Sequence, residues 1–305
     1  MEHLLCLTDL SDDEIWQILH TARDLKAEWK AGGNKPLLAG KTLAMIFEKP
    51  SLRTRVSFEV AMVHLGGHAL YLSPGEIGLG KRESVADVAR VLSGYVQGIE
   101  ARVYAHRNIE LLARYASVPV INGLSDFSHP CQVLGDVLTL CEKRGQVKGQ
   151  KLAFVGDGYN MANSLLFIGA KLGIDTVIAS PRGYEPHPAV VRLANEAAKQ
   201  SGATLTITND PAAAVEDADV VYTDVWASMG QEQETEKRKR DFAGFQVNSE
   251  LMAHARPDAL FMHCLPAHRG EEVTDEVADS PNSVIFEEAE NRLHAQKAVL
   301  AILMG

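Results

Sequence analysis

The chain is poor in cysteine, with only four among its 305 residues: Cys6, Cys131, Cys141 and Cys264. Their separations match no metal-ligand spacing, and four is too few for a disulfide-stabilised scaffold of this length. Sparse cysteines of this kind indicate reduced thiols, so we expect a cytoplasmic protein without structural disulfides.

Long apolar runs and an excess of basic residues are also missing. No segment approaches the roughly 20 apolar residues that cross a bilayer, and the N-terminal MEHLLCLTDLSDDE has acidic residues where a signal peptide has basic ones. The net charge of −10 and the pI near 5.6 argue against nucleic acid or an anionic membrane as the main partner. An anionic substrate would therefore need a local basic pocket.

The chain is long and apolar enough for two domains. With 305 residues, 46% of them hydrophobic, it can bury a large core and suits two domains of about 150 residues. A capping box of Ser11 and Glu14 opens the first helix, which runs to about Lys30. Further helices are expected near residues 53–65, 84–96, 108–115, 130–143, 160–172, 188–200, 211–216 and 286–303. Strands are expected at 42–47, 68–72, 98–104, 118–121, 151–155, 175–179, 204–208, 219–223, 259–262 and 283–285.

Strands that alternate with helices predict right-handed βαβ units and parallel sheets. We therefore expect an α/β protein of two doubly wound parallel-sheet domains with an interdomain cleft, linked by long helices. Gly145 and Gly149 mark the boundary, which gives domains of residues 1–145 and 146–286. Ligands of such sheets bind at the carboxyl ends of the strands.

The segment Phe47–Arg55, FEKPSLRTR, joins an expected strand to the helix after it. Ser51 is a natural N-cap, and the first four N–H groups of a helix lack internal partners. The helix dipole adds about half a positive charge there, and Arg53, Thr54 and Arg55 add donors and fixed charge. This arrangement predicts a site for a phosphate-sized anion, although an ordinary capped helix with solvated arginines has the same residues.

The helix that follows this segment is apolar on nearly all sides. Its apolar residues occupy two faces: Val56, Val60 and Val63 on one, and Phe58, Met62 and Leu65 on the other. We expect the helix to be buried, which would hold its N-terminus rigidly.

Two more polar features of the first half point to the same chemistry. Arg102 interrupts an apolar strand, where a guanidinium needs a buried anionic partner or an anionic ligand. His129-Pro130-Cys131-Gln132 opens a long helix, and His129 and Gln132 both donate and accept hydrogen bonds. The same four residues would also fit a histidine that only caps the helix.

Two clusters follow strands of the second half. His263-Cys264-Leu265-Pro266 places Cys264 at a strand end, which suits a functional thiol, whereas an inert buried cysteine is the alternative. Asp224 and Ser228 follow the strand at 219–223 and offer a carboxylate and a hydroxyl to a cationic amine.

Gly156-Asp157-Gly158 follows a strand and opens a helix, as a dinucleotide-binding turn does. The third glycine of that fingerprint is replaced by Met161, and no acidic residue ends the next strand, so we expect no nicotinamide cofactor. The charged run at 232–241 is interpreted as a solvated loop or helix face, with a mobile lid as the alternative.

Taken in order, these motifs resemble those of the aspartate/ornithine carbamoyltransferase family over essentially the whole chain. Ser51-Leu52-Arg53-Thr54-Arg55 resembles the carbamoyl-phosphate motif of the family, and His129-Pro130-Cys131-Gln132 resembles its second signature. Asp224 with Ser228-Met229-Gly230, and His263-Cys264-Leu265-Pro266, resemble the ornithine branch, since the aspartate branch lacks the last two motifs.

The resemblance implies that residues 1–145 bind carbamoyl phosphate, with a C-terminal helix at about 287–305 packing back on them, and that residues 146–286 bind ornithine. The implied carbamoyl-phosphate residues are Ser51, Leu52, Arg53, Thr54, Arg102, His129, Gln132, Cys264, Leu265 and Arg292. The implied ornithine residues are Asn160, Asp224, Ser228 and Met229.

The implied reaction transfers the carbamoyl group of carbamoyl phosphate to the δ-amine of L-ornithine, giving L-citrulline and phosphate. Catalytic roles fall to Arg102 and His129, which would polarise the carbonyl, and to Cys264, which would help keep the amine neutral. Orientation and electrostatic stabilisation suffice, so neither a metal nor a cofactor is expected. The family also implies a homotrimer with shared active sites, with higher assemblies left open, and a role in arginine biosynthesis, with the direction of flux left open.

Two positions depart from the family pattern. Leu52 stands where ornithine enzymes often have threonine, a change of little effect if the residue contributes its backbone N–H. Gly78 stands where family members usually have Gln or His that reaches the phosphate of a neighbouring subunit, so either that contact is lost or Lys81 or Arg82 replaces it. The alternatives are a carbamoyltransferase for putrescine or an N-acylated ornithine, a non-catalytic carbamoyl-phosphate-binding relative and, more distantly, a dehydrogenase.

Overall fold

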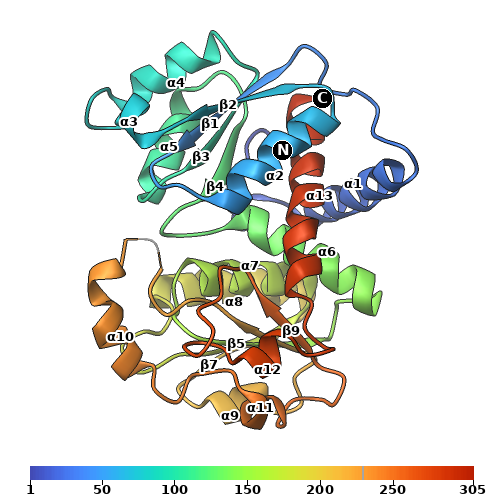
Figure 1. Cartoon of the computed structure of the whole chain (residues 1–305), viewed down its shortest axis with the longest axis vertical. Helices are drawn as coiled ribbons and strands as arrows, with labels where there is room; N and C mark the ends of the chain where they lie inside the picture. The colour runs from blue at the N-terminus through green and yellow to red at the C-terminus, as the bar shows by residue number, and fades with distance from the viewer. Residues whose placement is uncertain (229) are drawn as a thin grey trace. The chain divides into compact units, whose positions relative to one another are not determined.

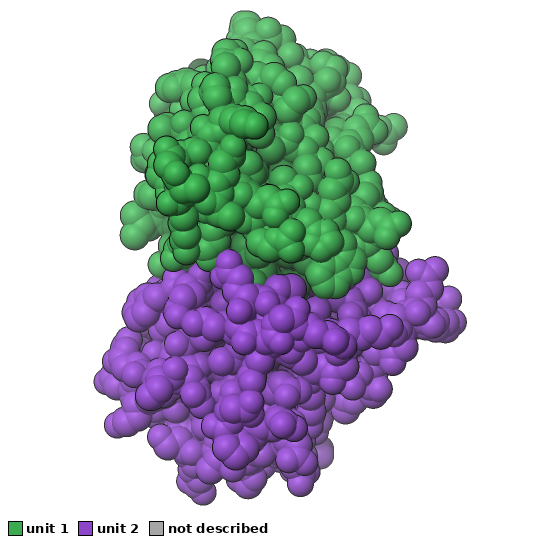
Figure 2. Space-filling model, turned by 90° about the vertical axis from the view of Figure 1, so that its right-hand side faces the viewer, with its two compact units in different colours: residues 1–138, 290–305 green, residues 139–289 purple. Residues whose placement is uncertain are grey.

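The computed structural model describes residues 1–228 and 230–305. They form two compact units, one of Met1–Leu138 with Glu290–Gly305 and the other of Thr139–Ala289, coloured separately in Figure 2. The helices α6 (Pro130–Arg144) and α13 (Ile285–Met304) each begin in one unit and end in the other. The last residues of the chain therefore belong to the same unit as the first.

The first unit is built on a parallel sheet of four strands in the order β2-β1-β3-β4 (Figure 1). The strands are β1 (Thr42–Phe47), β2 (His68–Leu72), β3 (Gly98–Arg102) and β4 (Val120–Leu124). The helices are η1 (Leu7–Asp9), α1 (Asp12–Lys30), α2 (Leu52–His64), α3 (Pro74–Ile77), α4 (Val85–Ser93) and α5 (His106–Tyr115). The predicted capping box opens α1: Ser11 Oγ accepts the N–H of Glu14 at 3.2 Å, and the Glu14 carboxylate accepts the N–H of Ser11 at 2.9 Å.

Alternation along β3 divides its side chains between the two faces of this sheet. Ile99 belongs to an apolar core shared with residues of α4 and α5, whereas Glu100 and Arg102 lie on the opposite face. The end of α13 packs on that opposite face, because a Cβ added at Gly98 would lie 2.7 Å from Met304 Sδ. Polar groups of β3 and of α13 therefore share one side of the sheet.

The second unit is built on a parallel sheet of five strands in the order β7-β6-β5-β8-β9. The strands are β5 (Lys151–Val155), β6 (Asp175–Ala179), β7 (Leu205–Thr208), β8 (Val220–Thr223) and β9 (Leu260–His263). The helices are α7 (Asn160–Leu172), α8 (Pro188–Ser201), α9 (Pro211–Val215), η2 (Glu232–Glu234), α10 (Thr235–Asp241), α11 (Ser249–Met252) and α12 (Asp275–Ala278). The predicted α/β class and the two parallel sheets are confirmed.

One predicted strand is wrong and another is displaced. Residues 283–285 form no strand: Ser283 makes only an isolated bridge to Phe261, and Ile285 opens α13. A short apolar run fits a buried helix start as well as a strand, which explains the error. The strand expected at 118–121 lies at Val120–Leu124 instead.

The expectation that α2 is buried on nearly all sides is also wrong. Phe58 and Met62 are fully buried, but Leu52, Val56 and Val63 are 76%, 46% and 69% exposed. These three side chains leave an apolar surface along α2 that the chain itself does not cover. Among the described residues, no helix has the length and apolar character needed to span a membrane.

Candidate active site

Each sheet has a topological switch point, where the connection from one strand runs toward one edge of the sheet and the connection from its neighbour runs toward the opposite edge. The predicted site residues follow the two strands at each switch point. In the first sheet this switch point lies between β1 and β3; Ser51 follows β1, and Arg102 ends β3. In the second sheet it lies between β5 and β8; Asn160 follows β5, and Asp224 follows β8. Such switch points are where open α/β sheets bind ligands.

The N-terminus of α2 has the predicted cap. Ser51 is extended, with φ −149° and ψ 117°, and its Oγ accepts the N–H of Thr54 at 3.4 Å. Leu52 opens the helix with its side chain 76% exposed, so only its backbone is available to a ligand at the cap. Arg55 contacts Glu59 at 2.9 Å and lies over the Tyr71 ring at 4.0 Å.

Two guanidinium groups converge on the hydroxyl of Thr54, which is fully buried. Arg292 Nη2 on α13 donates to Thr54 Oγ1 at 2.9 Å, and Arg102 Nη1 on β3 lies 3.5 Å from the same oxygen. We call Ser51, Thr54, Arg102 and Arg292 the anion cluster. Its two fixed positive charges beside a helix N-terminus suit a phosphate group.

His129 precedes α6 and is nearly fully buried. Burial, followed by the charges of Arg292, Arg102 and Arg53, holds the pKa of its imidazole well below the usual value. The ring is therefore neutral near pH 7 and can donate one N–H to a carbonyl oxygen. One turn along α6, Gln132 Nε2 donates to Asp136 Oδ1 at 2.8 Å, which orients the Gln132 amide.

The second unit brings Asp224 and Cys264 together, and we call this pair the amine cluster. Cys264 Sγ, after β9, lies 3.0 Å from Asp224 Oδ1, which also accepts the N–H of Val225 at 2.8 Å. Burial raises the pKa of the Asp224 carboxyl above its usual value. A carboxyl in this state holds its proton to a higher pH than an exposed aspartate does.

Ser228 and Gln231 close a short loop after β8. Ser228 donates its N–H to Gln231 Oε1 at 2.9 Å, and its carbonyl accepts the N–H of Gln231 at 3.0 Å. Asn160 is buried at the start of α7. Met229, also predicted in this group, lies outside the described residues.

His263 holds the backbone of the loop that carries Leu265. Its Nδ1 accepts the N–H of Leu265 at 2.8 Å, and its Nε2 lies 3.1 Å from Glu272 Oε1. Leu265 has φ 56°, a left-handed conformation that costs free energy for a branched side chain, and the bond to His263 helps to maintain it. No role was predicted for His263 or Glu272 from the sequence.

Asp224, His263 and Cys264 place one donor atom each within 4.8 Å of one another, a grouping that could hold a metal ion. Both nitrogens of the His263 ring already have partners, however, and a metal needs one of these lone pairs. The donor set therefore fits a hydrogen-bonded pair better than a metal centre.

The charged run at 232–241 contains a buried residue that sequence reasoning missed. Arg238 on α10 is 6% exposed and pairs with Asp157 at 2.6 Å, and its guanidinium also donates to the carbonyl of Trp226 at 2.9 Å. The prediction of a solvated face is therefore wrong at this position. Burial raises the pKa of Asp157 to about 6 despite the charge of Arg238.

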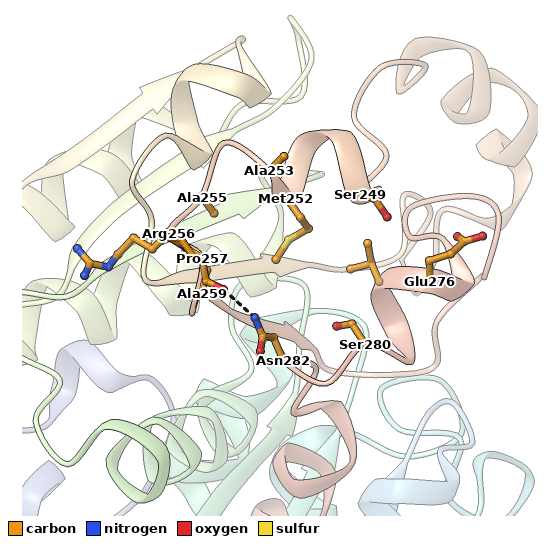
Figure 3. Close-up of a pocket in the computed structure, with 11 residues that line it drawn as sticks. Ser249, Met252, Ala253, Ala255, Arg256, Pro257, Ala259, Glu276, Ser280 and Asn282 are labelled. Atoms are coloured by element: carbon orange, nitrogen blue, oxygen red, sulfur yellow. Dashed lines mark hydrogen bonds between the residues drawn. The ribbon is translucent and has the colours of Figure 1, made fainter.

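Two cavities in the second unit involve other residues. One of about 730 Å³ lies among the turn at Asp157–Tyr159, the loop before α8, and α10. The other, of about 430 Å³, is shown in Figure 3; its lining includes Arg256 and Asn282, and Asn282 Nδ2 donates to the carbonyl of Pro257 at 3.2 Å. The described lining of both cavities includes none of the predicted site residues.

Comparison with known protein families defines the class. Residues 2–142 match the carbamoyl-P binding domain of aspartate/ornithine carbamoyltransferases, and residues 148–303 match the Asp/Orn binding domain of the same proteins. The two matches span almost the whole chain and define a carbamoyltransferase. The chain belongs to the aspartate/ornithine carbamoyltransferase family, as its motifs predicted.

Individual relatives are named ornithine carbamoyltransferase. The ornithine carbamoyltransferase of Pyrococcus abyssi is 63% identical over 302 residues, which cover 99% of this chain and 95% of that protein. The solved structure of ornithine carbamoyltransferase from Pyrococcus furiosus has a TM-score of 0.97 and 62% identity, covering 100% of this chain and 97% of its own. The structure from Thermus thermophilus has a TM-score of 0.90 and 48% identity, covering 100% and 99%.

Proposed function

We propose that this protein transfers the carbamoyl group of carbamoyl phosphate to the δ-amine of L-ornithine, and that its first unit holds the former and its second unit the latter. It is a carbamoyltransferase that gives citrulline and phosphate. The observation that carries the assignment of residues is the convergence of Arg102 and Arg292 on the buried Thr54 hydroxyl at the N-terminus of α2.

The phosphate group would lie at this N-terminus. Ser51 and Thr54 would offer hydroxyls, Leu52 its backbone N–H, and Arg53, with the two clustered guanidiniums, positive charge. The Leu52 side chain is 76% exposed and has no polar group, which supports a role through the backbone N–H. Charge-assisted bonds of this kind are about twice as strong as neutral ones.

The carbamoyl carbonyl would be polarised by Arg102 and the neutral imidazole of His129, while Gln132 would bind the carbamoyl end. The lone pair of the δ-amine attacks the carbamoyl carbon, negative charge develops on the carbonyl oxygen, and the bond to the phosphate oxygen breaks. Donors fixed where that charge develops contribute roughly 3–4 kcal/mol each to lowering the barrier. Leu265, through its carbonyl, would line this end of the site together with Cys264.

Ornithine would be held by Asn160, Asp224, Ser228 and Met229 at its α-amino and α-carboxylate groups. A protonated amine has no lone pair, so the δ-ammonium must lose a proton before it attacks. The amine cluster supports this step, since Cys264 Sγ and Asp224 Oδ1 lie 3.0 Å apart and the Asp224 carboxyl has a raised pKa. We propose that this pair binds the amine and keeps it neutral.

We further propose a homotrimer in the cytoplasm that acts in arginine biosynthesis. The exposed apolar surface of α2 supports a subunit interface, because contiguous apolar surface is usually covered by a partner. Lys81 or Arg82 would supply the contact that Gly78 cannot make to a neighbouring subunit. The four cysteines form no disulfide among the described residues, which suits a reducing compartment, and a relative from Pyrococcus furiosus is described as anabolic.

Turnover of the purified chain with different amines tests the assignment. Carbamoyl phosphate is supplied with ornithine, putrescine, N-acetylornithine or aspartate in separate reactions, and each ureido product is measured. Turnover with ornithine alone is expected. Turnover with another amine would retain the phosphate assignment and overturn that of the amine, and no turnover with any of them would favour a binding protein.

A further inference from the structure

Glu100 is a fully buried glutamate at the centre of the first sheet. It lies on β3, the strand between β1 and β4, and its backbone pairs with Met45 on one side and Ile121 on the other. Carboxylates are almost never fully buried without a charged or hydrogen-bonded partner. A glutamate at this position therefore calls for an explanation.

Gly123 on the neighbouring strand makes room for this carboxyl group. A Cβ added at Gly123 would lie 1.7 Å from Glu100 Oε1 and 2.8 Å from its Cδ. Any other residue at position 123 would displace the carboxyl, so the chain keeps a glycine-lined space for it beside the anion cluster.

Among the described residues, neither carboxyl oxygen of Glu100 has a hydrogen-bond partner. The charged groups that face it are Arg102, two residues along the same face of β3, and Arg292 from α13. The strands β1 and β4 contribute no titratable side chain, and α6 contributes Cys131, whose pKa of about 12 keeps it uncharged. Burial raises the pKa of Glu100 well above its usual value, and the two guanidiniums oppose that rise.

The arginines that face Glu100 are the arginines of the anion cluster, so a bound phosphate and the Glu100 carboxylate would compete for the same positive charge. With no anion bound, and at a pH above its raised pKa, Glu100 is ionised and balances part of that charge. With a phosphate dianion bound, a second buried negative charge becomes costly, and the carboxyl takes a proton.

We propose that Glu100 is the charge-balancing residue of the anion cluster, and that, wherever it is ionised in the free protein, it takes up one proton from solvent when carbamoyl phosphate binds and returns it when phosphate leaves. The inference rests on the proposed function, because it needs carbamoyl phosphate at Arg102 and Arg292. By linkage, the affinity for carbamoyl phosphate then falls as pH rises. The fall approaches tenfold per pH unit once Glu100 is ionised in the free protein.

Calorimetric titration with carbamoyl phosphate, from about pH 7.5 to about pH 9.5, tests this, because the phosphate group is a dianion throughout that range. Repeating each titration in buffers of different ionisation enthalpy gives the number of protons taken up. The variants are Glu100→Gln, which is nearly isosteric and always neutral, and Glu100→Leu, which serves if the amide destabilises the fold. Glu110→Gln on α5, a substitution of an exposed glutamate, is the matched control.

The parent protein and Glu110→Gln are expected to take up as much as one proton per site at the upper end of this range. Glu100→Gln and Glu100→Leu should take up none, and should bind more tightly than the parent near pH 9.5 while matching it near pH 7.5. Equal proton uptake in all four proteins, or a pH-independent loss of affinity in both Glu100 variants, would overturn the proposal. Absence of carbamoyl-phosphate binding by the parent would instead count against the proposed function.

Discussion

Arg292 donates a hydrogen bond of 2.9 Å to Thr54, which lies 238 residues earlier in the chain. Thr54 is fully buried in the first turn of α2, and Arg102 approaches the same hydroxyl from β3 at 3.5 Å. One hydroxyl therefore orients two guanidiniums that come from a strand and from the final helix. Preorganisation of this kind lowers the free-energy cost of binding an anion.

Thr54→Val keeps the shape of the side chain and removes the oxygen that both guanidiniums share. A hydrogen bond to a charged group contributes about 1.5–3 kcal/mol, so KM for carbamoyl phosphate should rise roughly tenfold to a hundredfold. Steady-state kinetics with each substrate varied in turn would measure the change. Thr54→Ser keeps the hydroxyl and should retain most of the affinity, and an equal loss in both variants would contradict the argument.

Cys264→Ala removes the sulfur that lies 3.0 Å from Asp224. If the pair keeps the ornithine amine neutral, the variant should turn over roughly a hundredfold more slowly near pH 7, the size of a lost acid–base contribution. Its activity should recover as pH rises, because more of the amine is then neutral without help. Cys141→Ala, on α6, is the control, and an unchanged rate and pH profile in Cys264→Ala would contradict the role.

Arg238→Met should destabilise the second unit, since it leaves Asp157 buried without its partner at 2.6 Å. Breaking a buried ion pair from one side typically costs about 3–5 kcal/mol in the free energy of unfolding. Urea denaturation would measure it, with the exposed Arg240→Met as control. Adding Asp157→Asn to Arg238→Met should restore part of the stability. A double variant whose loss of stability equals the sum of the losses in the two single variants would argue against a stabilising ion pair.

Lys297 predicts a pH dependence of stability at alkaline pH. It is fully buried on α13, its Nζ donates to Asn34 Oδ1 at 2.7 Å, and burial lowers its pKa from 10.5 to about 8. Between these values the folded state binds fewer protons than the unfolded state, so stability should rise with pH from about 8 and level off near 10.5. The thermal unfolding temperature of the parent should rise with pH in this range, and that of Lys297→Met should change less. Identical pH profiles in the two proteins would contradict the role of Lys297.

Val63→Asp places a charge on the exposed apolar surface of α2. If this surface is a subunit interface, the variant should dissociate, because a buried unpaired carboxylate is unfavourable. Light scattering after size-exclusion chromatography would measure the mass. Leu193→Asp on α8, where the leucine is 53% exposed in the second unit, is the control. A parent protein that is already monomeric, or a variant of unchanged mass, would argue against the interface.

The sequence was a good guide where local rules decide the structure. The strands at 42–47, 68–72, 151–155 and 175–179 were predicted to the residue, because each is a short apolar run bounded by turn residues. The cap at Ser51 was predicted because cap residues act on their own helix. These features depend on neighbours within a few positions.

The sequence was a poor guide where residues distant in the chain decide the environment of a side chain. Arg238 was predicted to be solvated because its neighbours in sequence are charged. Its partner Asp157 lies 81 positions earlier and is brought to it only by the fold. Glu100 gave no signal beyond an acid in an apolar strand, and the glycine that makes room for it lies on another strand. The apolar pattern of α2 is the same whether its valines pack against another part of this chain or against another subunit.

The anion cluster draws Ser51, Thr54 and Arg102 from the first half of the chain and Arg292 from the segment 290–305, which completes the first unit. Synthesis proceeds from the N-terminus, so the sheet of this unit emerges long before the helix that supplies its last guanidinium. The unit that begins to form first is therefore finished last. Until the ribosome has translated the segment that carries Arg292, the nascent chain has the hydroxyls of Ser51 and Thr54 but only one of the two guanidiniums of the anion cluster.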